Sequence, residues 1–407
     1  MHNEKQIAPP LWLLMPLVAF PQIGETIYTP CLPNMVQAFA TSTQMVNLTL
    51  SLYLVGFALG VLCFGILCDR IGRRPSMLLG LSIYVIASAF CILAPNILTL
   101  LISRLAQGFG ASVGSVVVQT MMRDLYIGVR RSQVFSLVTA ALALSPAIGP
   151  LIGGGVDELV GFKGNFAVLL LMGLLLLIIS HFQLNETQPP EIRLLSRNSV
   201  FSVSTKMLAD PRIWKSVFMV AGCNGILFSF YGEAPYIFQK ILGYTPSEYG
   251  RIGIAIALSS MLGALLSHRL GSKLATERLV QIGAGLTLTG AMLFFSLASV
   301  DFINSSTRNL STACVIFPMA FIFVGFGLII PNTLAVALKA YATSLGIAGA
   351  VLGLSYYLFI ALITEGMGLL HNGTIMAMPS YFVGLSAFMC LVSFLKVVNV
   401  EPHINRA

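Results

Sequence analysis

Apolar runs of roughly 20 residues, separated by short polar segments, recur along this chain of 407 residues. An α-helix of that length spans the hydrocarbon core of a bilayer. Twelve such runs can be placed, at residues 11–33, 46–68, 76–94, 97–121, 132–157, 165–184, 213–238, 248–268, 277–300, 309–336, 345–370 and 374–397. Only 9% of the residues are charged, against about 25% in soluble domains. The sequence therefore predicts an all-α membrane protein with twelve transmembrane helices.

Positive residues are distributed unevenly about these spans. An even number of spans puts both termini on one side, and most of the 23 Lys and Arg residues fall in segments on that side. The opposite side has Lys163, Lys240, Arg251 and Arg308. The positive-inside rule then places both termini in the cytoplasm. This orientation explains the net charge of +8 better than nucleic-acid binding does, because the positive residues form no basic patch.

The longest polar segment divides the spans into six and six. It runs from Asn185 to Arg212 and contains Pro189-Pro190, several serines and mixed charges. We expect an N-terminal six-helix bundle over residues 1–184, a cytoplasmic linker over 185–212 and a C-terminal six-helix bundle over 213–407.

Short sequence echoes relate the two halves. The segment from Asp69 to Arg74 follows span two, and the similar segment from His268 to Lys273 follows span eight. Gly24-Glu25 in span one is matched by Gly232-Glu233 in span seven. Parallel repeats imply two pseudo-symmetric bundles around a central cavity, with transport by alternating access. Coincidence in an apolar chain is the alternative explanation of such short echoes.

Span one carries a single carboxylate, Glu25, among four prolines. A carboxylate near the centre of a membrane helix costs about 2.5–3.5 kcal/mol, so we expect it to face a cavity or a partner charge. The prolines, which withdraw backbone donors and permit kinks, are Pro16, Pro21, Pro30 and Pro33.

The loop after span two contains the most specific motif, from Gly65 to Pro75 (GILCDRIGRRP). It resembles the signature loop between helices two and three of the major facilitator superfamily, and the resemblance extends over essentially the whole chain. The resemblance implies that Asp69 contacts the start of span eleven near Gly346 and holds the outward-facing state. The candidate residues for this conformational latch are Gly65, Asp69, Arg70, Gly72, Arg73, Arg123 and Asp124.

Span four contains Arg104-Leu-Ala-Gln107-Gly108-Phe-Gly110-Ala, similar to the R-x-x-Q-G-x-G-a motif of proton-coupled members of that superfamily. We interpret its glycines as helix-packing positions, because no βαβ unit accompanies them to make a dinucleotide site. At 1.5 Å per residue, Arg104 and Glu25 both lie about 10–12 Å from the outer ends of their spans. They could therefore meet or share a water.

Span five contains a run of small residues and prolines from Ser145 to Gly155 (SPAIGPLIGGG). It resembles the G-x-x-x-G-P-x-x-G-G motif of exporters in the superfamily, with Ser145 in place of the first glycine. The resemblance implies drug:proton antiport and argues against a nutrient importer, although Gly/Pro kinks also occur in other membrane helices. The motif residues are Pro146, Gly149, Pro150, Gly153 and Gly154.

Within the drug:proton antiporters, the chain is most similar to the bicyclomycin-resistance type of multidrug exporter. The similar segments are residues 28–33, 122–126, 331–332 and 346–353. That type usually has an aspartate two residues before the tyrosine, where this chain has Thr26, and Glu25 lies one residue earlier. Glu233 is a second departure, since a small polar residue is common there.

Glu25, Arg104 and Glu233 are the candidates for proton coupling. Burial would favour protonated Glu25, a nearby Arg104 would favour the ionised form, and a conformational change could alternate these influences. A proton taken up from outside would displace a cationic or polar substrate, and its release inside would reset the site. Alternatively, Glu25 is a permanently paired or snorkelling residue near the outer interface. Which of Glu25 and Glu233 dominates is left open.

Aromatic side chains are candidates for the wall of the substrate cavity, because their rings bind lipophilic cations and planar molecules without strict geometry. The alternative role for each is in the interfacial belt or the core. The candidates are Tyr28, Tyr53, Phe57, Phe230, Tyr231, Tyr236, Tyr356 and Tyr357.

Enzymatic function is disfavoured because the sequence has no H-E-x-x-H or G-x-S-x-G motif and its five histidines are scattered. We expect no cofactor and no metal. The leading hypothesis is a proton-coupled exporter of small amphipathic compounds or drugs, and the alternative is a dedicated exporter of one metabolite or siderophore. The expected partners are the small-molecule substrate, protons and the lipid bilayer, with no nucleic acid, and the expected state is a monomer.

Overall fold

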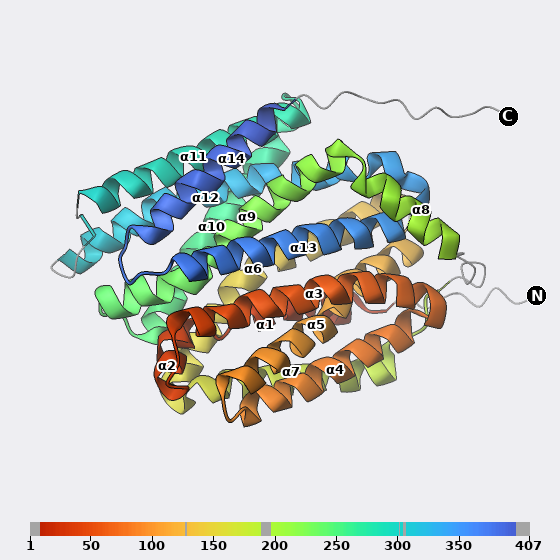
Figure 1. The fold of residues 1–407 in the computed structure, drawn as a ribbon. Helices are drawn as coiled ribbons and strands as arrows, with labels where there is room; N and C mark the ends of the chain where they lie inside the picture. The colour runs from red at the N-terminus through yellow and green to blue at the C-terminus, as the bar shows by residue number, and fades with distance from the viewer. Residues whose placement is uncertain (1–8, 127, 189–196, 301, 304–306, 396–407) are drawn as a thin grey trace, which may run out of the picture.

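The computed structural model describes residues 9–126, 128–188, 197–300, 302–303 and 307–395. These residues fold into long helices that run side by side (Figure 1). Among them, ten helices are long and apolar enough to cross a membrane. The other two spans are the first one, which is broken, and α6 (Gly128–Val160). The fold is therefore the predicted one, with twelve transmembrane helices in two bundles of six.

The N-terminal bundle contains α1 (Leu11–Thr26), η1 (Thr29–Cys31), α2 (Leu32–Ala38), α3 (Thr43–Ile71), α4 (Arg73–Leu93), α5 (Ile97–Leu125), α6 and α7 (Phe162–Gln183). A short helix, α8 (Arg197–Leu208), precedes the second bundle. That bundle contains α9 (Pro211–Pro235), η3 (Tyr236–Ile241), α10 (Pro246–Leu270), α11 (Thr276–Ser299), α12 (Arg308–Ala337), η5 (Lys339–Ser344), α13 (Leu345–Leu370) and α14 (Ala377–Phe394).

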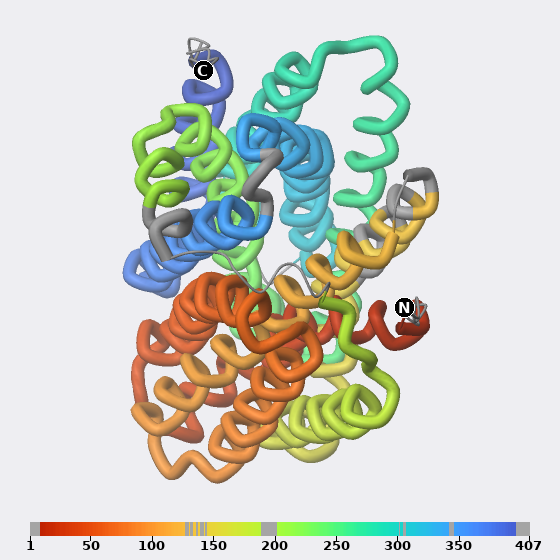
Figure 2. The backbone as a smooth tube through the Cα atoms, turned by 90° about the vertical axis from the view of Figure 1, so that its right-hand side faces the viewer, coloured from red at the N-terminus to blue at the C-terminus, as the bar shows by residue number. Residues whose placement is uncertain are grey.

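The two ends of the molecule are called the α2 end and the α8 end, after the short helix at each. Figure 1 shows α2 at one end and α8 at the other. At the α8 end, the start of α9 meets the end of α14, where Lys215 Nζ donates to the carbonyl oxygens of Ser393 and Leu395 at 3.0 and 2.8 Å. Figure 2, viewed from the α8 end, shows the red-to-yellow bundle on one side and the green-to-blue bundle on the other.

The first span is a helix followed by an irregular segment, where the sequence predicted one kinked run. Helix α1 has 16 residues, about 24 Å, which is shorter than the hydrocarbon core, so η1 and α2 complete the crossing. Span seven repeats this arrangement, because α9 ends at Pro235 and continues as the π-helix η3. Glu25 and Glu233 therefore both lie in the last turn of a helix, directly before an irregular segment. The sequence echo between the two positions thus corresponds to a shared local structure.

Glycines bring the backbones of the N-terminal bundle into direct contact. A Cβ atom added at Gly108 of α5 would overlap the carbonyl oxygen of Tyr53 in α3, and one at Gly56 would overlap that of Leu105. Gly110 packs in the same way against the backbone of α4. This confirms the interpretation of the glycines in span four as helix-packing positions.

Helices α3 and α13 form an antiparallel seam between the two bundles along their whole length. At the α2 end, a Cβ added at Gly368 would lie 3.3 Å from Asn47 Cβ. Halfway along, the rings of Phe57 and Tyr357 lie 4.5 Å apart. At the α8 end, a Cβ at Gly346 would lie 3.7 Å from Asp69 Oδ2. The contacts thus approach the start of α13 as they approach the end of α3, which is the pattern of two antiparallel helices.

The two bundles are also joined at the α2 end away from this seam. Gln239 Nε2 donates to Pro30 O at 2.7 Å, and the backbone nitrogen of Ser247 donates to Glu158 Oε1 at 3.0 Å. Deeper in the interface, Tyr231 Oη donates to Pro146 O at 3.0 Å. These bonds connect η1 to η3 and α6 to α9 and α10, so the structure is closed at the α2 end.

Gly108→Ala is expected to lower the free energy of unfolding by about 1–3 kcal/mol, because the added methyl group forces α3 and α5 apart. The measurement is denaturant unfolding of the purified protein in detergent micelles. Gly285→Ala in α11 is the matched control, since a Cβ there meets no atom within 4 Å. Equal stability of the two variants would contradict this account of the packing.

Candidate functional site

Arg104 is completely buried within the N-terminal bundle and has no carboxylate partner among the residues that the structure describes. Its guanidinium carbon lies 4.3 Å from the ring centroid of Tyr28 and 4.2 Å from that of Tyr53. Its Nη1 donates to Gly24 O at 3.2 Å and to Gln107 Oε1 at 2.5 Å. The positive charge is therefore stabilised by two aromatic faces and two oxygen dipoles.

Glu25 lies one residue beyond the carbonyl that Arg104 contacts, and its side chain is buried. No ion pair joins Glu25 to Arg104 within the described residues, and Glu25 Oε1 has no hydrogen-bond partner. The carboxyl group lies close enough to Arg104, Tyr356 and Tyr357 for the charges to interact. The predicted meeting of Glu25 with Arg104 is thus a near approach without an ion pair, in which Gly24 and Gln107 bind Nη1 while Nε and Nη2 have no hydrogen-bond partner. Glu25 lies near α13 of the other bundle.

Glu233 lies at the α2 end, where the bundles meet. Its Oε2 is 2.7 Å from His371 Nδ1, and its Oε1 accepts a hydrogen bond from Asn47 Nδ2 at 3.3 Å. The carboxylate therefore links α9 both to α3 of the N-terminal bundle and to the segment after α13.

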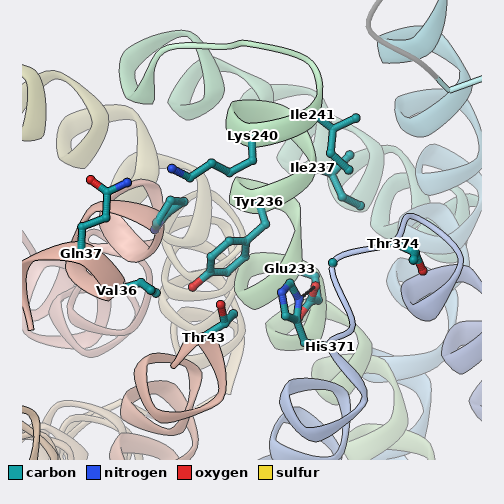
Figure 3. Close-up of a pocket in the computed structure, with 12 residues that line it drawn as sticks. Val36, Gln37, Thr43, Glu233, Tyr236, Ile237, Lys240, Ile241, His371 and Thr374 are labelled. Carbon is teal, nitrogen blue, oxygen red and sulfur yellow. Dashed lines mark hydrogen bonds and ion pairs between the residues drawn. The ribbon is translucent and has the colours of Figure 1, made fainter. Parts of the chain in front are cut away.

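A pocket of about 260 Å³ opens beside this carboxylate and imidazole. Figure 3 shows Tyr236 and Thr43 near the pair and Lys240 extending toward Gln37. The pocket is lined by residues of both bundles, namely Pro33, Val36, Gln37, Thr43, Glu233, Tyr236, Ile237, Lys240, Ile241, His371, Gly373 and Thr374.

The predicted cavity aromatics fall into four groups. Tyr28 and Tyr53 enclose Arg104, and Tyr236 lines the pocket at the α2 end. Tyr357 contacts Tyr356 at 4.7 Å between ring centroids and Phe57 of the opposite bundle at 4.5 Å, so these three lie between the bundles. The remaining pair, Phe230 and Tyr231, is buried in α9, where Phe230 packs on Phe323 inside the C-terminal bundle.

The motif after α3 forms a buried charge triad at the α8 end. Arg73 is 1% exposed, with Nη1 at 2.8 Å from Asp69 Oδ1 and Nε at 3.0 Å from Asp124 Oδ2. Arg73 Nη1 also donates to Cys68 O at 2.7 Å. Arg70 is exposed, Arg123 adjoins the triad in sequence, and Gly65 packs against Ala350.

Asp69 also reaches the start of α13 at Gly346, where the family resemblance placed it. The resemblance implied that this contact holds the outward-facing state. In the structure, the contact coexists with a closed α2 end, so it does not by itself distinguish the two states.

The turn between α3 and α4 binds a carboxylate from the end of the N-terminal bundle. Glu186 accepts hydrogen bonds from the backbone nitrogens of Arg73 and Arg74 at 2.9 and 3.2 Å. Gly72 adopts a φ of 105°, and a Cβ there would collide with the Glu186 carboxylate. Glycine is required at this position for both reasons.

The small residues of the span-five motif contact both bundles. Gly149 and Gly153 pack against Thr26 and Ile27 at the end of α1. Gly154 packs against Pro246 of α10, and the carbonyl of Pro150 packs against Gly250. Helix α6 therefore lies between the end of α1 and α10, as expected for a helix pressed against the other half.

Sequence reasoning missed His371, Asn47 and Glu186. His371 was grouped with scattered histidines because it directly follows span eleven, and only the register of α3 against α13 places it beside Glu233. Asn47 was missed for the same reason, because its partner Glu233 is 186 residues away in the sequence. Glu186 lies at the start of the polar linker. No sequence motif there indicates that its carboxylate binds the turn between α3 and α4.

Comparison with known proteins connects this architecture to transporters. Residues 14–364 match the family model described as Major Facilitator Superfamily. An uncharacterized transporter of Rickettsia bellii (strain RML369-C) is 36% identical over 93% of this chain and 94% of that protein. Multidrug resistance protein D of Escherichia coli (strain K12) is 26% identical over 97% of this chain and 96% of that protein. The fold is similar to a bacterial homolog of the human lysosomal transporter Spinster, with a TM-score of 0.73 and 15% identity over 94% of each chain.

Arg73→Ala is expected to lower the free energy of unfolding by about 3–5 kcal/mol, because it leaves Asp69 and Asp124 without their shared cation. Denaturant unfolding in detergent micelles measures the loss. Arg70→Ala removes an exposed arginine from the same motif and should change stability by no more than about 0.5 kcal/mol. Similar losses in both variants would show that the buried triad is not what stabilises this end.

Proposed function

The chain belongs to the major facilitator superfamily and is a membrane transporter, and from this premise we propose that it exports small amphipathic compounds in exchange for protons. The proposal places it in a bacterial inner membrane with both termini in the cytoplasm. The α2 end then faces outward and the α8 end faces the cytoplasm. Transport proceeds by alternating access between these two ends.

The observation that carries the proposal is the state of the Glu25 carboxyl group. It is buried near the interface between the bundles, and one of its oxygens has no hydrogen-bond partner. A carboxylate in such surroundings is costly unless it binds a proton or a cation. Arg104 lies nearby but forms no ion pair with Glu25, and its Nη1 binds Gly24 and Gln107 instead. Glu25 is therefore available to bind either a proton or a cationic substrate.

Competition for this one carboxyl group suffices to couple the two fluxes. A proton that enters from the outer side binds Glu25 and releases the substrate outward. Release of the proton to the cytoplasm leaves the carboxylate free for the next substrate. Arg104 favours the ionised carboxylate in this exchange, because its positive charge lies nearby.

Three further observations support export of amphipathic compounds. The Tyr356, Tyr357 and Phe57 rings lie between the bundles near Glu25, where they can bind a planar or cationic molecule. The small-residue face of α6, from Pro146 to Gly154, contacts both bundles, as expected for the antiporter motif. Similarity to a protein named for multidrug resistance points to the same substrate class.

The remaining predicted residues have positions that suit supporting roles. Glu233 joins the bundles at the outer end and takes part in proton uptake there. The triad of Asp69, Arg73 and Asp124 fixes the cytoplasmic end of α3, which lets Asp69 contact α13 at Gly346.

Glu25→Gln is expected to abolish transport driven by a pH gradient, with a loss of roughly 10²-fold or more, because the amide cannot bind the proton. The measurement is ethidium and chloramphenicol transport in proteoliposomes with an imposed pH gradient. Glu277→Gln, which changes an exposed glutamate at the start of α11, is the control and should match the wild type. Gradient-driven transport that survives in Glu25→Gln would remove the proposal.

A disulfide between Asn47→Cys and Gly368→Cys is expected to stop transport by locking the outer end shut. A Cβ at position 368 lies 3.3 Å from that of Asn47, close to the roughly 3.5–4.5 Å range of disulfides. The pair is introduced after replacement of the seven native cysteines. Oxidation should block ethidium transport and reduction should restore it, so the reduced double variant is its own control. If transport continues while mass spectrometry shows the disulfide to be intact, transport does not involve opening at this end.

A further inference from the structure

A second carboxyl group lies on the seam between α3 and α13, closer to the outer end than Glu25. Glu365 lies one turn of α13 before Gly368, which meets Asn47, and Ser51 lies one turn of α3 after Asn47. The antiparallel register therefore places Ser51 beside Glu365, and the two side chains lie close together without forming a hydrogen bond. Glu365 is half-buried at this position, between the bundles.

The surroundings of Glu365 contain polar atoms that no protein group satisfies. Ser51 is 3% exposed, and its Oγ has no hydrogen-bond partner. Glu365 Oε2 is buried without a partner as well. Asn47 is also 3% exposed, and its Oδ1 is unsatisfied although its Nδ2 contacts Glu233. Unsatisfied buried acceptors and hydroxyls of this kind are costly in a membrane interior, and they mark a place where a proton or water is bound.

The charged and titratable groups around Glu365 come from four elements. Helix α9 contributes Glu233, which is paired with His371 from the segment after α13. Helix α14 contributes Tyr381, whose Oη donates to Ile363 O at 2.8 Å, two residues before Glu365. Helix α3 contributes only the neutral Ser51 and Asn47. No lysine or arginine is ion-paired with Glu365 in the part of the chain that the structure describes.

The acidic groups of the interface therefore occur in a graded order of depth. Glu233 and His371 line the pocket at the outer end, and Glu365 follows about one turn deeper along the seam. Glu25 follows Gly24, where an added Cβ would lie 3.2 Å from Tyr53 Oη, and Tyr53 lies two residues beyond Ser51 in α3. Glu365 thus lies between the outer pocket and Glu25.

We propose that Glu365, positioned by Ser51, is an intermediate proton-binding residue on the route from the outer pocket to Glu25. This inference rests on the proposed proton coupling and adds a residue to it. The proton leaves the Glu233–His371 pair, binds a carboxylate oxygen of Glu365, and is then released along the seam past Tyr357. The O–H bond at Glu365 breaks as an O–H bond at a Glu25 oxygen forms, through hydroxyl groups and water, so each transfer conserves charge and atoms.

The test compares Glu365→Gln, Glu365→Asp and Ser51→Ala with the wild type in proteoliposomes, with ethidium and chloramphenicol as probes. Each protein is assayed in two ways, by transport driven by a pH gradient and by probe exchange at equal pH on both sides. Exchange needs alternating access but no net proton transfer, so it reports a folded and moving transporter. Glu277→Gln is again the control at an exposed site.

Glu365→Gln should lower the gradient-driven rate at least about tenfold while exchange stays close to that of the wild type. Glu365→Asp should restore most of the gradient-driven rate, and Ser51→Ala should shift its dependence on outer pH. An unchanged gradient-driven rate in Glu365→Gln would overturn the proposal, as would a parallel loss of exchange, which indicates a structural role. A wild type that exchanges probe but ignores the gradient would instead overturn the proton coupling itself, and the route to Glu25 with it.

Discussion

The structure depends on how one buried arginine is stabilised without a counter-ion. Arg104 lies in the interior of the N-terminal bundle, where a charge is expensive. Two tyrosine faces, a backbone carbonyl and the amide of Gln107 meet its guanidinium, and Gln107 is itself fixed by a 2.8 Å bond to Ser88. The hydrogen bonds of Arg104 go to neutral oxygens through Nη1 alone, its Nε and Nη2 have no partner, and no ion pair joins it to Glu25 among the described residues. Because the two opposite charges do not pair, the Glu25 carboxyl group in α1 is available to bind and release a proton or a cation.

The seam between α3 and α13 determines where the polar groups of the interface lie. It is continuous from Asn47 and Gly368 at one end to Asp69 and Gly346 at the other, so the bundles stay in contact along one line. Polar groups recur on that line at several depths, whereas Phe57 and Tyr357 fill its middle. Closure at the α2 end also comes from η1 against η3 and from α6 against α9 and α10, away from the seam. Opening of the outer end would separate the seam at Asn47 and Gly368 together with these other contacts.

The fold could be predicted from sequence because its main determinant is local. Apolar runs of bilayer length predict spans whose ends the helices match within a few residues, and the echo of Glu25 by Glu233 predicted their equivalent positions. The site was predicted less completely. The rise per residue of an α-helix predicted similar depths for Glu25 and Arg104. It could not predict that the two side chains form no ion pair, because that depends on which groups contact the guanidinium. His371, Asn47 and Ser51 were invisible because their roles come from the register between helices that are hundreds of residues apart in sequence.

The central claim is that proton and substrate compete for the carboxyl group of Glu25. The most direct measurement is proton release on ethidium binding to the purified transporter, followed with a pH indicator in weakly buffered detergent solution. The account predicts that binding releases protons from the wild type and releases none from Glu25→Gln. Ethidium binding without proton release in the wild type, or undiminished release from the glutamine variant, would contradict it.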